Sequence, residues 1–563
     1  MPSTFYQHLS HESQVLVDQA MDVLRPSYDP EAGLIVHEWH GKKFHDHRSS
    51  MYYALGLMLQ GNEGCVQQVE KICRAVADMQ ADAPGEIFHG AYLSPGRAPV
   101  VYNALDYKRL GNYGRYYMDC FYEKMADHFR LHLQDDPDLA PFAEKIEGLL
   151  NLSTSETVPL VWTSYDPNMR EFNMMSFAML LEHFSNQLSP ECVQLIDHTC
   201  QLALEGAVER SRTNFTPLNT NIQCMHVFLL DYFGVRWDRA DYRAYALEYA
   251  HKMVDKYLQY HAAAEFNSPT YCGVDLANLG FWQRYGSNEE LKALGHTLEE
   301  GIWLDMMEFY NPAMNNFCGP YSRAYEPDMS VHTSFPAMLY TAMGEDVYPM
   351  HPVGAETPCD LLMVFGCINM PDAAKEALFT EKKDMSITHQ FRELSERGEP
   401  GRNDALCTAT SWISPDLMTG ALSGSENPSH QLHPLVIFWR GDRALGTIKL
   451  LRSYPNGSMQ HMHTVLFNGK AEKEHMTMDV DFQVNRDVKL FFEIEYPGIC
   501  DEAVITDTLW TLPGMKLHMD AQAPQFFLEK SENGNSLKVC YMSRARVPET
   551  KQMHFDMTAE ITH

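Results

Sequence analysis

Several short stretches of the sequence combine tyrosine, asparagine, arginine and histidine where helical patterns are interrupted. The most distinctive covers residues 315–328, where a Gly-Pro pair precedes Tyr321, Arg323, Tyr325 and Asp328. A tyrosine can take up and return a proton, and an arginine can stabilise negative charge that develops on a substrate. We therefore predict that Tyr321 and Arg323 are catalytic and that Tyr325 and Asp328 bind substrate. The alternative is a helix-to-helix connection whose side chains pack over neighbouring helix ends.

Two other stretches repeat this chemistry. Residues 265–275 contain Asn267 and Tyr271, and residues 214–221 end with Asn221. We predict that Tyr271 is catalytic and that both asparagines bind substrate. Helix capping is the competing interpretation, because an asparagine that caps a helix looks the same in sequence as one that binds a carboxylate.

Two further stretches are weaker on their own. Trp162 begins an aromatic and polar run that ends at residue 168, and residues 102–107 begin and end with tyrosine. We predict that Trp162 contacts the substrate. Together the stretches supply a base such as Tyr or His and a neutralising group such as Asn or Arg. Removal of a proton next to a carboxylate or carbonyl requires both.

Residues 37–48 hold four histidines just before a strong helical pattern. We interpret His40 and His47 as candidates for proton transfer, since imidazole exchanges a proton near neutral pH and Asp46 could orient one of the rings. Metal ligation and helix capping are the alternatives. The HExxH spacing of zincins is absent, so we assign no metal ligand, and the metal question for this cluster stays open.

The composition describes a globular protein with an acidic surface. The chain has 563 residues, 45% of them hydrophobic, and a formal net charge of -31. With no Lys/Arg-rich run, neither a nucleic acid nor an anionic membrane is an expected partner. The thirteen cysteines lack CxxC pairs, and the N-terminal residues lack the pattern of an export signal, so we expect reduced thiols and a cytoplasmic location.

The periodicity of apolar residues divides the chain into three parts. Residues 1–345 show helical spacing in about a dozen segments, which we predict to be paired helices curled into an (α/α) toroid. Residues 346–429 are punctuated by Pro and Gly, and we predict an irregular transition there. Residues 430–563 alternate with a period of two between turn residues, which predicts an antiparallel β-sandwich. The predicted fold class is therefore α+β and multidomain.

A helical toroid followed by an antiparallel sandwich resembles the toroid-type polysaccharide lyases, the heparinase and alginate lyase group. That resemblance implies a Tyr or His that moves protons and an Asn, His or Arg that holds a uronate carboxylate. The residue types that match are Asn221, Asn267, Tyr271, Tyr321 and Arg323, with His40 or His47 as alternatives. It would make the protein a lyase that carries out β-elimination on a uronate-containing saccharide without a cofactor.

Two other functions fit the sequence. The acidic charge and the expected compartment favour a small intracellular substrate, which suits a cyclase or isomerase of secondary metabolism with an apolar pocket. A carbohydrate-binding protein without catalysis is the third class. The sequence contains no GxxxxGK[ST] loop, no GxGxxG after a strand and no GxSxG elbow, so nucleotide-dependent and serine-hydrolase activities lack support. The oligomeric state stays open.

Overall fold

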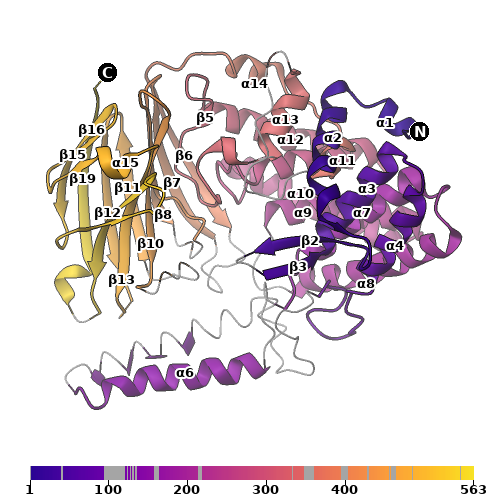
Figure 1. Ribbon diagram of the computed structural model, residues 1–563, viewed down its shortest axis with the longest axis horizontal. Helices are drawn as coiled ribbons and strands as arrows, with labels where there is room; N and C mark the ends of the chain where they lie inside the picture. Colours follow the sequence, from indigo (N-terminus) through magenta and orange to yellow (C-terminus); the bar gives the residue numbers. More distant parts are fainter. Residues whose placement is uncertain are drawn as a thin grey trace.

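The fold is described from a computed structural model of the whole chain. Its described residues are 2–39, 42–93, 121–122, 125–126, 128–129, 132–133, 136–157, 164–213, 219–332, 334–345, 347, 360–394, 404–425, 427, 430–455, 457, 459, 465–484, 486–545 and 547–562. Helices fill the first half and strands the second half (Figure 1).

The helices range from one turn to about seven turns in length. They are α1 (Thr4–Gln7), α2 (His11–Leu24), α3 (His47–Gln60), α4 (Cys65–Ala77), α6 (Ala140–Thr157), α7 (Met169–Phe184), α8 (Pro190–Thr213), α9 (Thr220–Arg236), α10 (Ala240–Tyr260), α11 (Cys272–Tyr285), α12 (Glu289–Phe309), α13 (Ser334–Met343), α14 (Asp372–Ala377) and α15 (Ile499–Glu502), with 3-10 turns η1 (Arg25–Ser27), η3 (Met329–Val331), η4 (Leu361–Val364) and η5 (Pro548–Thr550). Local caps fix several ends. Asn288 accepts a hydrogen bond from the Leu291 N–H at 2.9 Å and caps the start of α12.

The long helices form two concentric layers. Helices α3, α7, α9, α11 and α13 contact one another in that order, and α2 contacts both α3 and α13, which closes the ring. Outside them, α4, α8, α10 and α12 each pack against the inner helix that precedes them in the chain. The inner helices are buried on almost every side, whereas the outer helices bury one face. The predicted toroid of paired helices is therefore confirmed (Figure 1).

The strands are concentrated in the second half. They are β1 (Tyr28–Asp29), β2 (Leu34–Trp39), β3 (Lys42–Asp46), β4 (Tyr310–Asn311), β5 (Asn316–Phe317), β6 (Met385–Leu394), β7 (Asp404–Ile413), β8 (Leu417–Ser425), β9 (Leu435–Arg440), β10 (Leu445–Ser453), β11 (Val465–Glu472), β12 (His475–Phe482), β13 (Val488–Glu495), β14 (Val504–Ile505), β15 (Leu509–Leu512), β16 (Met515–Gln522), β17 (Phe527–Lys530), β18 (Ser536–Ser543) and β19 (Gln552–Ile561). The strands from β6 to β19 belong to one antiparallel sheet.

This sheet divides at β8, which pairs with β7, β9 and β11. One arm continues through β10, β13, β18 and β17, and the other continues through β12, β19, β16, β15 and β14. The arms face each other, because the Phe492 ring of β13 lies 5.1 Å from the Phe555 ring of β19 and 5.4 Å from the Trp510 ring of β15. Apolar side chains alternate inward along most of these strands, so the predicted antiparallel sandwich is confirmed.

The sheet begins earlier than the sequence predicts. Strands β6, β7 and β8 lie inside residues 346–429, which we expected to be an irregular transition. The alternation of residues such as those from 385 to 394 was hidden by the Pro and Gly residues around them, and short strands give a weak periodic signal. The sheet therefore starts at Met385 and not near residue 430.

Residues 316–326 lie between the toroid and the sheet domain and contact both. The Ser411 hydroxyl donates to the Gly319 carbonyl oxygen at 2.6 Å, and the backbones of Tyr321 and His433 exchange hydrogen bonds at 3.2 and 3.0 Å. Gly420 makes this approach possible, since a Cβ at that position would overlap the Gly319 carbonyl group. The segment that the sequence singled out therefore lies between the two domains.

Substituting Gly420→Ala should destabilise the protein by about 1–3 kcal/mol, because the added methyl group forces the 316–326 segment away from β8. Thermal unfolding followed by calorimetry measures the change. Gly148→Ala is the matched control, since a Cβ on Gly148 in α6 meets no atom within 4 Å. Equal unfolding temperatures for both variants would contradict the tight contact between Gly420 and Gly319.

Candidate functional site

A buried ion pair joins the start of α9 to the segment between the domains. Arg323 Nη1 donates to Glu265 Oε1 at 3.0 Å, and the Glu265 carboxylate also accepts the Thr220 backbone N–H at 3.2 Å. Glu265 is 1% exposed and the Arg323 side chain is 11% exposed. The carboxylate thus satisfies an amide at the N-terminus of α9, where the helix dipole favours negative charge.

Tyr271 and Gln431 complete this cluster. Arg323 Nε donates to Gln431 Oε1 at 2.7 Å, and the Tyr271 hydroxyl donates to the same oxygen at 3.2 Å. The guanidinium carbon of Arg323 lies 4.3 Å from the centre of the Tyr271 ring. A guanidinium in this position stabilises negative charge on the phenol oxygen after proton loss. Of the predicted catalytic residues, the structure therefore brings Tyr271 and Arg323 together.

Asn221 lies one residue beyond Thr220 in the first turn of α9. Its side chain is almost fully buried, and its Oδ1 makes no hydrogen bond with any described residue. Because the Thr220 N–H binds Glu265, this amide lies on the same rim of the toroid as the ion pair. This oxygen is an acceptor, so it is suited to a hydroxyl or N–H donor of a ligand.

Asn267 holds the backbone of the site in place. Its φ of 54° is in the left-handed region, which asparagine tolerates better than most residues. Its Nδ2 donates to the Cys318 carbonyl at 2.7 Å and the Pro320 carbonyl at 3.2 Å. The next residue, Ser268, donates to the Arg323 carbonyl at 2.6 Å. These bonds set the position of Arg323 and give Asn267 a structural role, and its role in substrate binding stays a prediction.

Tyr321 is also structural, which corrects its assignment as a catalytic residue. Its side chain is fully buried, and its hydroxyl donates to the Phe317 carbonyl at 2.6 Å. Burial is the main cause that raises the pKa of Tyr321 well above its usual value. A phenol held by a backbone carbonyl in the protein interior cannot reach a substrate.

Tyr325 and Asp328 differ in their settings. The Tyr325 side chain is 53% exposed, and its ring centre lies 6.0 Å from that of Tyr271. Asp328 caps η3, since its Oδ1 accepts the Ser330 N–H at 2.8 Å. Tyr325 therefore lies beside Tyr271, and Asp328 caps η3. The assignment of both residues to substrate binding stays a prediction.

His47 lies elsewhere on the rim. It begins α3 and accepts a hydrogen bond from Asn173 Nδ2 at 3.1 Å, and its ring lies 5.3 Å from that of Tyr92. These partners come from α7 and from the loop after α4, so His47 is not part of the Tyr271 cluster. The remaining predicted residues, His40 and Trp162, and the stretch 102–107 lie outside the described residues.

The other histidines of residues 37–48 bind protein groups separately. His37 Nε2 lies 2.9 Å from the Ser49 hydroxyl, and His45 Nε2 lies 3.1 Å from Asp29 Oδ2. In the part of the chain that the structure describes, no three His, Cys, Asp or Glu side chains are grouped as metal ligands. No helix of that part combines the length and apolarity needed to cross a membrane.

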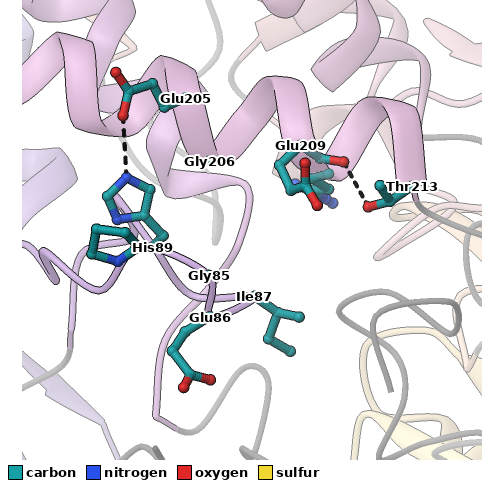
Figure 2. Close-up of a pocket in the computed structure, with 10 residues that line it drawn as sticks. Gly85, Glu86, Ile87, His89, Glu205, Gly206, Glu209 and Thr213 are labelled. Atoms are coloured by element: carbon teal, nitrogen blue, oxygen red, sulfur yellow. Dashed lines mark hydrogen bonds and ion pairs between the residues drawn. The ribbon is translucent and has the colours of Figure 1, made fainter. Parts of the chain in front are cut away.

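A cavity of about 300 Å³ lies between residues 84–89 and the second half of α8 (Figure 2). His89 Nδ1 accepts a backbone N–H at 3.1 Å, so its Nε2 carries the proton that it shares with Glu205 at 3.4 Å. Arg170 at the start of α7 donates to two backbone carbonyls of this loop at 2.9 and 2.6 Å. This rigid cavity was not predicted from the sequence, because its residues carry no motif.

Sequence analysis also missed two members of the main cluster. Glu265 was assigned no role although it begins the 265–275 stretch, and Gln431 was assigned no role because it follows the expected irregular transition. The signal that could have found Glu265 is its place beside Asn267 in a loop between helices. Nothing in the sequence links Gln431 to Tyr271, since 160 residues separate them.

The fold and the cluster define a class of protein: a helical toroid joined to an antiparallel sandwich, with Tyr, Arg, Glu and Gln at the junction. Residues 14–117 and 150–362 match the domain of unknown function DUF8769, and the chain belongs to that family. No curated protein matches the sequence.

Solved structures of similar layout include a chondroitin AC lyase from Streptomyces coelicolor A3 in complex with chondroitin sulphate, with 11% identity, a TM-score of 0.40, and coverage of 98% of this chain and 83% of that one. The heparan sulfate lyase HepC from Pedobacter heparinus has 9% identity and a TM-score of 0.31, with coverage of 98% and 88%. A heparinase III, the BT4657 gene product, has 10% identity and a TM-score of 0.34, with coverage of 99% and 85%. At these TM-scores the similarity carries no argument about activity.

Substituting Gln431→Leu should destabilise the protein by about 1–3 kcal/mol, because it removes the oxygen that accepts hydrogen bonds from both Arg323 and Tyr271. Calorimetric unfolding measures the effect, and separation into two transitions would report loss of coupling between the domains. Gln390→Leu, at an exposed position on β6, is the control. If Gln431→Leu and Gln390→Leu unfolded at the same temperature, Gln431 would not stabilise the contact between the two domains.

Proposed function

We propose that this protein is a lyase that cleaves a uronate-containing saccharide by β-elimination at Tyr271. The observation that carries the proposal is the stacking of the Arg323 guanidinium on the Tyr271 ring while both side chains bind Gln431 Oε1. This arrangement joins a proton-transfer group to a fixed positive charge that is already in place before the reaction.

In the proposed reaction Tyr271 takes part in two proton transfers. The carbon next to the uronate carboxylate loses a proton, and its electron pair forms a carbon-carbon double bond as the bond to the glycosidic oxygen breaks. As a phenolate, Tyr271 takes up the proton of the carbon and then gives this proton to the departing oxygen, so the phenolate is regenerated at the end of the cycle. Arg323 stabilises the phenolate before and after the two transfers.

Asn221 and Tyr325 would hold the sugar. An amide N–H donates to a carboxylate oxygen, and withdrawal of charge from that carboxylate makes the neighbouring proton more acidic. The exposed Tyr325 ring beside Tyr271 offers an apolar face on which a sugar ring can stack. The cyclase and isomerase alternative has no comparable support, because the described residues around Tyr271 are charged and polar and do not form an apolar chamber.

Tyr271→Phe should lower kcat by about 10²-fold or more, because the variant keeps the ring under Arg323 but cannot transfer a proton. The measurement is the ultraviolet absorbance of unsaturated uronate products during incubation with a panel of uronate oligosaccharides. Tyr321→Phe is the matched control, and it should keep its turnover because that hydroxyl binds a backbone carbonyl.

Two results would contradict the proposal. Wild-type turnover in Tyr271→Phe would remove this residue from the reaction. Oligosaccharide binding without any unsaturated product, across the whole panel, would favour a carbohydrate-binding protein without catalysis.

A further inference from the structure

Asp275 lies on α11 one turn after Tyr271 and is fully buried. Neither of its carboxylate oxygens has a hydrogen-bond partner among the described residues. An ionised carboxylate without partners is very unfavourable in the protein interior, so a buried acid in this setting retains its proton.

The groups around Asp275 contain more acid than base. The charged groups that act on it among the described residues are Glu265 and Arg323. The neighbouring titratable groups are the thiols of Cys224 on α9 and Cys272 on α11, and burial raises the pKa of both thiols well above the usual value, so both are neutral. Two carboxyl groups therefore share one guanidinium, and the buried cluster is electrically neutral only when one carboxyl group is protonated.

The hydrogen bonds decide which of the two acids holds the proton. Glu265 accepts a hydrogen bond from Arg323 at 3.0 Å and another from the Thr220 N–H at 3.2 Å. Asp275 has no such donor among the described residues. Burial first and then the charge of Glu265 raise the pKa of Asp275 well above its usual value, against the opposing effect of Arg323.

We propose that Asp275 is a positioning residue that holds one proton for the site, which keeps Glu265 bound to Arg323 and Arg323 stacked on Tyr271. Loss of this proton would add a second buried negative charge next to Glu265 and compete for the single guanidinium. The site is then competent only on the acidic side of this ionisation. The consequence for turnover rests on the proposed function, whereas the location of the proton does not.

Asp275→Asn tests the location of the proton, because the amide has the shape of a protonated carboxyl group and no charge. The unfolded wild type releases the Asp275 proton near the ordinary pKa of an aspartate, and the folded protein retains it, so the wild type loses stability as the pH rises between these two pKa values. Asp275→Asn does not lose stability in this way, because its amide carries no ionisable proton. It should therefore unfold at a higher temperature than the wild type at about pH 8, and the difference should shrink towards about pH 4.

The control is Asp255→Asn, an exposed substitution on α10, which should follow the wild type at each pH. A difference between Asp275→Asn and the wild type that does not change with pH would overturn the proposal. If Asp275→Asn does not fold, infrared spectroscopy of wild type with labelled aspartate carboxyl groups decides the question near neutral pH. Burial also raises the pKa of Asp305 to about 7, so the spectrum is recorded in the Asp305→Asn background. A protonated aspartate band in that background supports the proposal, and its absence overturns it.

The second readout is the pH profile of kcat/KM for uronate elimination. The alkaline limb of the profile should move to higher pH in Asp275→Asn, which a purely structural role would not cause. If Asp275→Asn eliminates uronate at the wild-type rate and the alkaline limb of its pH profile does not move, the positioning role is overturned. A pH-dependent stability difference without any elimination activity supports the buried proton and contradicts the proposed function alone.

Discussion

The structure around the candidate site depends on the buried ion pair between Glu265 and Arg323. Removing two charges from water is costly, and the interior compensates only where both groups are fully hydrogen-bonded. Here Glu265 binds the first turn of α9, and Arg323 binds Gln431 of the sheet domain. One ion pair thus fixes a helix of the toroid, the connecting segment and the sandwich relative to one another.

The same constraint explains why proton-transfer chemistry is expected at the junction. The inner helices direct their first turns towards this rim, which supplies Tyr271 and Asn221, while the sheet domain supplies Gln431. Glu265 of the toroid and Gln431 of the sheet domain both bind the guanidinium that lies over the phenol. The toroid provides rigidity through its buried inner helices, and the second domain orients the side chains, so the site depends on both halves of the chain.

The sequence predicted the architecture better than the site. Helical and alternating periodicity report which faces are buried, and these patterns are long in the toroid and regular after residue 430. The site depends on which tyrosine hydroxyl forms a hydrogen bond with which acceptor. Tyr271 and Tyr321 both follow a break in a helical pattern, yet one donates to a side-chain amide and the other to a backbone carbonyl in the interior. That distinction, and the contribution of Gln431, arise from contacts between distant segments that a single sequence does not encode locally.

A double-mutant cycle on the ion pair tests the account most directly. The unfolding free energies of wild type, Glu265→Gln, Arg323→Gln and the double variant give the coupling between the two side chains. Each single variant leaves a buried charge without its partner, and the double variant removes both charges. We expect a coupling of about 2–3 kcal/mol, with the double variant more stable than the sum of the single losses implies. If the loss of unfolding free energy in the double variant equalled the sum of the losses in the single variants, the two side chains would not be coupled. That result would contradict the claim that the ion pair holds the site together.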